Sequence, residues 1–113
     1  MFKIGDFSKM SKVTIKALRY YEKEGLINPT FIDPNTSYRY YESSQLLDIS
    51  KIIHLRQAGL SIKDIKNILD GYDIVEILKK RKKEIEKNLD TYNTQLSKIN
   101  YLLGEKICKM RYL

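Results

Sequence analysis

The stretch "ALRYYEKEGLINPTFIDPNTSYRYY", residues 17–41, carries the clearest structural signals in the chain. It contains two copies of Arg-Tyr-Tyr, one on each side of a segment with two prolines. The first copy lies in a helical pattern that ends at Gly25, because glycine readily adopts the left-handed conformation found just past many helices. The second copy follows "DPNTS", whose proline, aspartate and asparagine favour a tight turn. We therefore predict a helix followed by a turn-linked pair of strands, each with its own arginine and tyrosine cluster.

Two short helices are predicted before this turn, separated by the short connection "SKV". Residues 4–10 repeat apolar side chains every three positions, and Thr14 is a suitable N-cap for a second helix that begins at residue 15. On that helix Ala17, Leu18 and Tyr21 form the inward face. The outward face carries residues spaced three and four positions apart, here called the basic stripe: Lys16, Arg19, Tyr20 and Lys23. Two short helices joined in this way form a helix-turn-helix.

Positive charge is concentrated around the basic stripe, which the net charge of the whole chain does not show. The net charge is +7, but residues 1–73 hold 11 basic and 9 acidic side chains, whereas residues 74–113 hold 10 and 5. Between Lys9 and Lys23 there are five basic side chains and one acid, Glu22. Such a local excess is typical of nucleic-acid-binding surfaces. The alternative is a solvated surface helix with several lysines.

The residues on both sides of the turn predict a two-stranded hairpin, here called the wing. Residues 30–33 and 38–41 are rich in β-prone side chains. Strand alternation puts Arg39 and Tyr41 on one face, and Tyr38 and Tyr40 on the other. A lone hairpin is marginally stable, so this one must pack on the helices. An arginine on such a wing can reach a DNA phosphate or the minor groove.

Two further helices are predicted after the wing. The first begins near Glu42 or Ser43 and runs to about Gln57, and the second follows Ser61 and ends at Gly71. Their expected inner faces are Leu46, Ile49, Ile52 and Ile53 in the first, and Ile62, Ile65, Ile68 and Leu69 in the second. Ser61 and Asp64 resemble a capping box at the start of the second helix. The free N–H groups there, with Lys63 in the first turn, suit a phosphate.

Residues 74–103 are predicted to form one long helix. Its apolar residues repeat with the 3.5-residue period of a coiled coil, and we call them the seam: Leu78, Ile85, Leu89, Tyr92, Leu96, Ile99 and Leu103. The seam is narrow and about 39 Å long at ~1.5 Å per residue, so we expect a second copy of the chain to cover it. The alternative is packing within one chain. The run "KKRKK" at residues 79–83 fits a solvated helix face better than a nucleic-acid patch.

The remaining composition argues against several other classes of protein. With one cysteine, Cys108, and one histidine, His54, we expect no internal disulfide, no metal site and no cofactor. No 18-residue apolar run is present, so we expect no membrane span and no membrane partner. The charged N-terminal residues do not resemble a signal peptide, which indicates a cytoplasmic protein. We do not expect an enzyme, because no carboxylate pair, His-Cys arrangement or glycine-rich phosphate loop stands out.

Taken in order, these motifs resemble the MerR family of bacterial transcription regulators. The resemblance runs from Ile4 to about Leu69 and rests on "IGDFSKMSKVTIKALRYYEKEGLINP", "DPNTSYRYY" and "QLLDISKIIHLRQAGLSIKDIKNIL". The wing is most similar to the BmrR-like branch, which senses drugs and other hydrophobic cations. The resemblance implies a mainly α fold, with a winged helix-turn-helix DNA-binding domain over residues 1–72. It further implies that residues 73–113 form a helix that pairs antiparallel with the same helix of a second chain.

The resemblance also implies partners and residue roles. The partners are a pseudo-palindromic operator in promoter DNA, a second copy of the chain, and RNA polymerase, which responds indirectly when the DNA is bent and untwisted. An effector, not identified by the sequence, would control this switch. The residues that carry over as DNA-binding are Thr14, Lys16, Arg19, Tyr20 and Lys23 on the recognition helix, Tyr38, Arg39 and Tyr40 on the wing, and Ser61 and Lys63 on the later helix. Among them Arg19 and Tyr20 would face the DNA, and Arg39 would reach its backbone.

Two features depart from the family pattern. Lys12 occupies a turn position that is usually glycine, and a lysine holds that turn at small cost if its backbone stays out of the left-handed region. Only ten residues follow Leu103, too few for the C-terminal effector domain of the family. The chain is therefore either part of a longer protein or a minimal version that senses in another way. The alternative function is an interaction adaptor, a coiled-coil dimer whose small domain docks a protein instead of DNA.

Overall fold

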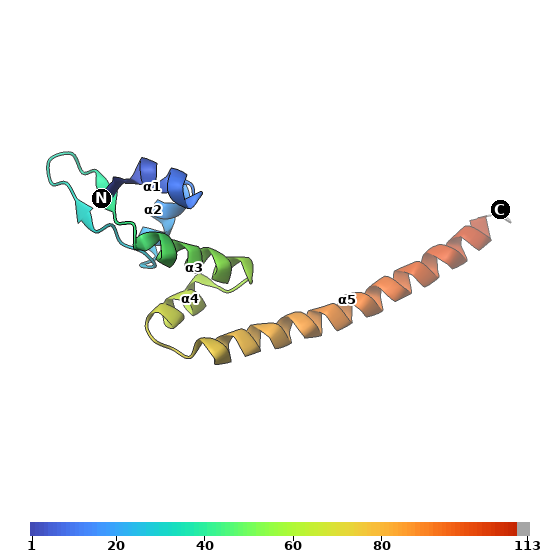
Figure 1. Ribbon diagram of the computed structural model, residues 1–113. Helices are drawn as coiled ribbons and strands as arrows, with labels where there is room; N and C mark the ends of the chain where they lie inside the picture. The colour runs from blue at the N-terminus through green and yellow to red at the C-terminus, as the bar shows by residue number, and fades with distance from the viewer. Residues whose placement is uncertain (111–113) are drawn as a thin grey trace. The chain divides into compact units, whose positions relative to one another are not determined.

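The computed structural model describes residues 1–110, with side chains through Glu105, so the side chain of Cys108 lies outside the described residues. The chain divides into two units, one over Met1–Asp73 and one that begins at Ile74 (Figure 1). In chain order the elements are β1 (Phe2–Lys3), α1 (Ile4–Ser11), α2 (Ile15–Lys23), β2 (Phe31–Ile32), β3 (Arg39–Tyr41), α3 (Gln45–Gln57), α4 (Ile62–Leu69) and α5 (Ile74–Met110). The predicted mainly helical fold is confirmed.

Helices α1 and α2 form the predicted helix-turn-helix, and local signals set the ends of α2. The Thr14 Oγ1 atom accepts a hydrogen bond from the Ala17 N–H at 3.1 Å, which confirms the predicted N-cap. Gly25, at φ +77°, follows the helix end as predicted. Its N–H and that of Leu26 donate to carbonyls of the last turn, at 3.0 and 2.9 Å.

The turn between α1 and α2 does not have the conformation in which a lysine at position 12 would cost little. Lys12 has φ 59° and ψ 29°, which is the left-handed conformation. A side chain with a Cβ atom costs about 1 kcal/mol there, because the Cβ crowds the following carbonyl. Lysine therefore carries a strain at this position that glycine would relieve.

The wing belongs to a three-stranded antiparallel sheet of order β1-β3-β2. Two strands were predicted, because two-residue β1 is too short to show alternation; it is defined by its pairing, with Phe2 opposite Tyr41. In the turn, Asp33 Oδ1 accepts from the N–H groups of Asn35 and Thr36 at 2.8 and 3.4 Å, as the turn sequence indicated. Strand β3 is thus central, and the hairpin is supported on its other side by the N-terminal residues.

The core of the first unit is apolar and is centred on a stacked pair of rings. Tyr41 and Phe7 are fully buried, with ring centroids 4.5 Å apart. The other core residues are Val13, Leu18, Tyr21, Leu26, Ile27, Ile49, Ile52, Leu55, Leu60, Ile65 and Ile68. The prediction of an inward Leu69 was wrong, since this last residue of α4 is 40% exposed. Val13, Leu26 and Leu60 lie in connections, where no helical period could mark them as buried.

The two later helices begin at polar residues that bond nearby backbone groups. Helix α3 begins at Gln45, later than predicted, because the Gln45 Oε1 atom accepts from the Glu42 N–H at 2.9 Å and holds the preceding turn. Its Nε2 donates to the Asn28 carbonyl at 2.6 Å, which ties α3 to the chain that leads into the wing. At the start of α4, Ser61 Oγ accepts from the Asp64 N–H at 3.0 Å, which confirms the predicted cap.

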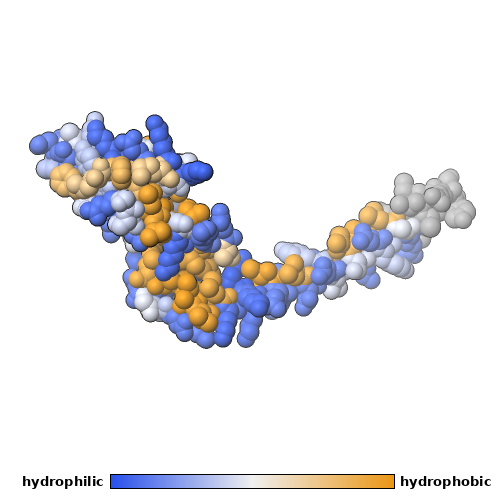
Figure 2. All heavy atoms as spheres, in the orientation of Figure 1, coloured by the Kyte–Doolittle hydropathy of each residue, from blue (hydrophilic) through white to orange (hydrophobic). Residues whose placement is uncertain are grey.

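Helix α5 continues without a break through the segment that carries the seam. All seven seam side chains are exposed in the single chain, from 39% at Leu78 and Ile85 to 65% at Tyr92. The leucine and isoleucine members of the seam contribute to the orange atoms along this helix in Figure 2. Among the residues that the structure describes, no helix is both long and apolar enough to cross a membrane.

Candidate nucleic-acid interface

Helix α2 presents the basic stripe to solvent. All four of its side chains are exposed, whereas Leu18 and Tyr21 on the opposite face are buried. The Tyr20 ring lies 5.9 Å from the ring of Tyr21 and is 46% exposed. The buried tyrosine thus supports the exposed one. The predicted two-faced character of α2 is confirmed by these exposures.

The wing places two tyrosines in different environments. Tyr38, next to the turn, is 53% exposed, and the Lys3 ammonium lies 5.0 Å from its ring centroid in a cation–π contact. Tyr40 is half-buried, with its ring 5.8 Å from that of Phe31 on the neighbouring strand. Tyr40 therefore stiffens the sheet, while Tyr38 remains accessible to a ligand. The preceding Ser37 has φ +62°, so the backbone turns sharply just before Tyr38.

Arg39 is paired with an acidic residue of α2. Its Nε donates to both carboxylate oxygens of Glu22, at 3.0 and 2.8 Å. The side chains are 32% and 18% exposed, so the pair is partly shielded from water. No described residue bonds the Nη nitrogens of Arg39, and the outer edge of its guanidinium group stays available. The candidate interface thus contains an ion pair between α2 and the wing.

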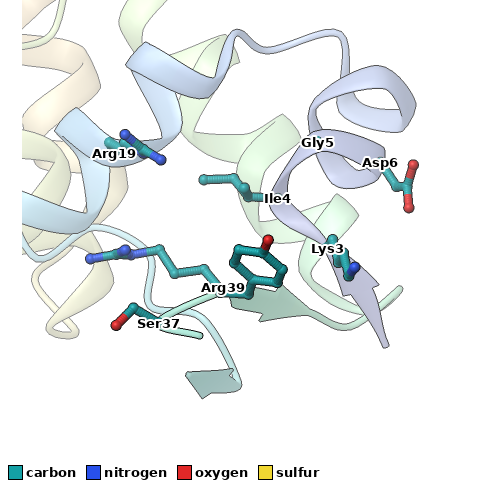
Figure 3. A pocket seen from close by; sticks show the side chains of 8 residues that line it. Lys3, Ile4, Gly5, Asp6, Arg19, Ser37 and Arg39 are labelled. Carbon is teal, nitrogen blue, oxygen red and sulfur yellow. The ribbon is translucent and has the colours of Figure 1, made fainter. Parts of the chain in front are cut away.

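Two hollows lie where α2 meets the wing. One, of about 660 Å³, is lined by Arg19, Glu22, Lys23, Thr36, Ser37, Tyr38 and Arg39. The other, of about 350 Å³, is lined by Lys3, Ile4, Gly5, Asp6, Arg19, Ser37, Tyr38 and Arg39 (Figure 3). Arg19 comes from α2 and Arg39 from β3, and both line each hollow. The structure therefore brings the first Arg-Tyr-Tyr copy of the sequence together with the second.

Three of the predicted DNA-binding residues lie at helix starts, away from the junction of α2 and the wing. Ser61 uses its hydroxyl oxygen in the cap of α4, and neither it nor the exposed Lys63 lines either hollow. The Lys66 Nζ would lie 3.6 Å from a Cβ atom built on Gly25, so the Lys66 side chain of α4 reaches the end of α2. Thr14 is exposed at the start of α2, with its oxygen engaged in the cap.

Two residues of the junction were missed by sequence reasoning. Lys3 reaches Tyr38 only because β1 pairs with β3, and two residues carry no readable strand pattern. Glu22 was noted as the single acid among the bases, but its contact with Arg39 joins residues 17 positions apart. Its position as the single acid beside a basic stripe was the available signal, because a carboxylate among basic side chains readily forms an ion pair.

Beneath the junction lies the buried hydroxyl of Tyr41. It has no hydrogen-bond partner among the described residues. Burial raises the pKa of Tyr41, and the nearby Glu22 carboxylate raises it further, against the lowering influence of Arg39 and Arg19. The phenol is therefore neutral at physiological pH.

The described residues hold no group of three or more side chains that could bind a metal ion. What they do hold is a helix with a basic exposed face, a wing at its side, and a separate long helix with an exposed apolar seam. This is the arrangement of a winged helix-turn-helix protein with a coiled-coil segment.

Comparison with known proteins identifies the family. The profile described as MerR HTH family regulatory protein matches residues 2–72, and the chain belongs to this family. It is 37% identical over 91 residues to the multidrug-efflux transporter 1 regulator of Bacillus subtilis strain 168, covering 79% of this chain and 33% of that protein. This likeness confirms the predicted resemblance to the drug-sensing branch.

Solved structures share the fold. The EcmrR–DNA complex in EcmrR-RPo matches 92% of this chain and 39% of that chain, with a TM-score of 0.84 and 40% identity. The N-terminus of the Bacillus subtilis multidrug transporter activator, MtaN, matches 91% of this chain and 98% of that chain, with a TM-score of 0.80 and 23% identity. The chain spans about a third of the length of the curated multidrug-efflux regulator that it matches.

Proposed function

We propose that the chain is a dimeric, sequence-specific DNA-binding regulator that binds a pseudo-palindromic operator within a promoter. The observation that carries this proposal is the junction of α2 and the wing, where Arg19, Lys23, Tyr38 and Arg39 line one hollow. A surface that combines arginines with exposed tyrosines suits phosphates and base edges. The likeness to a regulator solved as a DNA complex supports it.

Each element would have a distinct task on DNA. Helix α2 would enter the major groove, where Arg19 and Tyr20 reach base edges and Lys16 and Lys23 contact phosphates. The wing would contact the flanking backbone through Tyr38, Arg39 and Tyr40. Thr14, Ser61 and Lys63 would add phosphate contacts at the starts of α2 and α4, where N–H groups favour an anion.

We propose that the seam of α5 pairs with the seam of a second chain, and that the two helices run antiparallel. In a parallel pair the basic runs at residues 79–83 would lie beside each other, with Lys82 facing its own copy in the apolar layer. In an antiparallel pair centred between Asp90 and Thr91, each run instead lies beside residues 98–102, whose one charge is Lys98. Charge therefore favours the antiparallel pair.

This register makes a specific set of contacts. It sets Leu78 opposite Leu103, Ile85 opposite Leu96 and Leu89 opposite Tyr92 of the second copy. Shifting the helices by one heptad, about 10 Å, leaves seam residues at the ends without partners. The aligned register gives every seam residue a partner, with Ile99 opposite the aliphatic stem of Lys82, whose charged end can reach solvent.

The register can be tested by disulfide formation, with Cys108 replaced by serine throughout. The pair Ile85→Cys and Leu96→Cys in one chain should give a covalent dimer under mild oxidation. The pairs Leu78→Cys with Leu96→Cys and Ile85→Cys with Leu103→Cys report the two shifted registers and should crosslink far more slowly. Faster crosslinking in either shifted pair would refute the centring.

In the cell, the dimer would bend and untwist promoter DNA and so control RNA polymerase indirectly. An effector would set this switch, and the likeness to multidrug-efflux regulators points to a hydrophobic compound. We place the protein in the cytoplasm, where its promoter is, and assign it no catalytic role.

The direct test is a gel-shift titration with DNA from upstream of the chain's own gene. A shuffled probe of equal composition serves as the control, at two salt concentrations. We expect discrete, tighter binding to the native probe, and a steep loss of affinity with salt from counterion release. No DNA binding even at low salt would favour the protein-docking adaptor.

A further inference from the structure

The ion pair between Glu22 and Arg39 has a feature that simple charge balance does not explain. Acidic side chains generally weaken binding to DNA, yet Glu22 lies on the recognition helix, between Arg19 and Lys23. Its carboxylate lines the same hollow as both of these basic residues. An acid at this place either opposes DNA binding or improves it by acting on a neighbouring residue.

The geometry of the pair favours the second explanation. Both carboxylate oxygens of Glu22 accept from the Nε of Arg39, at 3.0 and 2.8 Å, and the Glu22 side chain is only 18% exposed. The pair fixes the Nε edge of the guanidinium group and leaves the Nη edge without a protein partner among the described residues. Because the guanidinium group is planar, fixing one edge also fixes where the other edge points.

The surroundings of Arg39 support a phosphate at this place. Arg19 and Lys23 line the larger of the two hollows with it. Figure 3, which shows the smaller hollow, places Ser37 beside Arg39. Arg39 has β-strand neighbours, so its backbone is held by pairing with Ile32. With the backbone fixed by the sheet and the Nε by Glu22, little side-chain freedom would remain to be lost on binding.

We propose that Glu22 is a positioning residue for DNA binding: it holds the Arg39 guanidinium group so that its free Nη edge meets a backbone phosphate between the recognition helix and the wing. This inference rests on the proposed function. It predicts that the acidic side chain of Glu22 strengthens operator binding, whereas its direct charge repulsion of DNA phosphates alone would weaken it. Glu22 also braces the wing against α2, so the distance between the two DNA-contacting elements depends on it.

The test is a pair of substitutions measured on the upstream DNA and on the shuffled probe. Glu22→Ala should weaken operator binding on the order of ten-fold, from the cost of ordering one long side chain in each protomer. The matched control is Glu24→Ala, since Glu24 lies just past the same helix and makes no ion pair among the described residues. Glu24→Ala should leave affinity equal or slightly raise it.

Measuring Glu22→Ala in a chain that already carries Arg39→Ala separates positioning from a general effect on the fold. When Arg39 is already alanine, Glu22 has nothing to position, and only its repulsion of phosphates remains. Glu22→Ala should then raise affinity slightly, so that the sign of its effect reverses between the two backgrounds. A purely structural role for Glu22 would instead weaken DNA binding in both backgrounds. Thermal unfolding of each variant identifies any loss of affinity that is due to misfolding.

The outcomes separate this inference from the proposed function. A wild-type chain that does not distinguish operator from shuffled DNA would overturn both. A wild-type chain that binds its operator, with Glu22→Ala binding equally or more tightly, would overturn the positioning role alone. In that case Glu22 competes with phosphate for Arg39 and restrains binding. Weaker operator binding by Glu22→Ala, together with tighter binding when the same change is made in the Arg39→Ala background, would establish the positioning role.

Discussion

Replacing Leu96 with lysine tests whether the exposed seam of α5 is an interface. Leu96 is 56% exposed in the single chain, so pairing would remove about half of its surface from water. Fully burying a leucine contributes about 1.5–3 kcal/mol, and half of that is about 1 kcal/mol. The two-fold axis places the change in the dimer twice, which gives about 2 kcal/mol. Moving two lysine charges against Ile85 of the partner adds at least a similar cost.

The expected total of about 4 kcal/mol corresponds to a roughly thousand-fold weaker dimer. Sedimentation velocity over a range of chain concentrations measures this directly. The matched control is Thr94→Lys, which adds the same charge at an exposed position outside the seam. We expect a dimer from wild type and from the control, and a monomer from Leu96→Lys with its helix content retained. A Leu96→Lys chain that stays dimeric at the same concentrations would refute the seam as the interface.

Three further substitutions test the first unit. Arg19→Ala should cost about 1–3 kcal/mol of operator-binding free energy if Arg19 reads a base, with a smaller loss on shuffled DNA. An equal loss on both probes would mean that Arg19 contacts a phosphate, and no loss on either would remove it from the interface. Tyr41→Phe should stabilise the fold by about 1 kcal/mol in urea unfolding, since it removes a buried hydroxyl without a partner and keeps the stack on Phe7. The folded pKa of Tyr41 is raised above 10.0, so wild type loses stability as the pH rises past this value, where only the unfolded phenol ionises. Tyr41→Phe should lack that part of the alkaline loss, and equal losses in both proteins would contradict the assignment. Lys12→Gly should raise the melting temperature, with a gain of about 0.5–1 kcal/mol from relief of the left-handed backbone, and a lower melting temperature would show that the turn is not strained.

The sequence was most informative where structure depends on neighbouring residues. Thr14 and Ser61 cap their helices, and Gly25 ends α2, because each feature is set within a few positions along the chain. The faces of α2 followed from its period. For the same reason, the heptad repeat identified the seam before its exposure in the single chain was known.

What could not be read from the sequence depends on contacts between distant residues. Strand β1 exists because Phe2 pairs with Tyr41, and nothing in two residues signals such a partner. The bond between Glu22 and Arg39 requires the wing to fold back against α2, which no local pattern specifies. The left-handed backbone of Lys12 is likewise imposed by the packing of the helices that it connects, since lysine itself disfavours it.

We expect two copies of this chain to read two symmetric half-sites, each through α2 and the wing. A hydroxyl-radical footprint of the wild-type chain on DNA upstream of its own gene tests this most directly. We expect two protected patches related by a two-fold axis and separated by a whole number of helical turns, both lost in Leu96→Lys at the same concentration. A single patch, or two patches that persist when the dimer is broken, would contradict it.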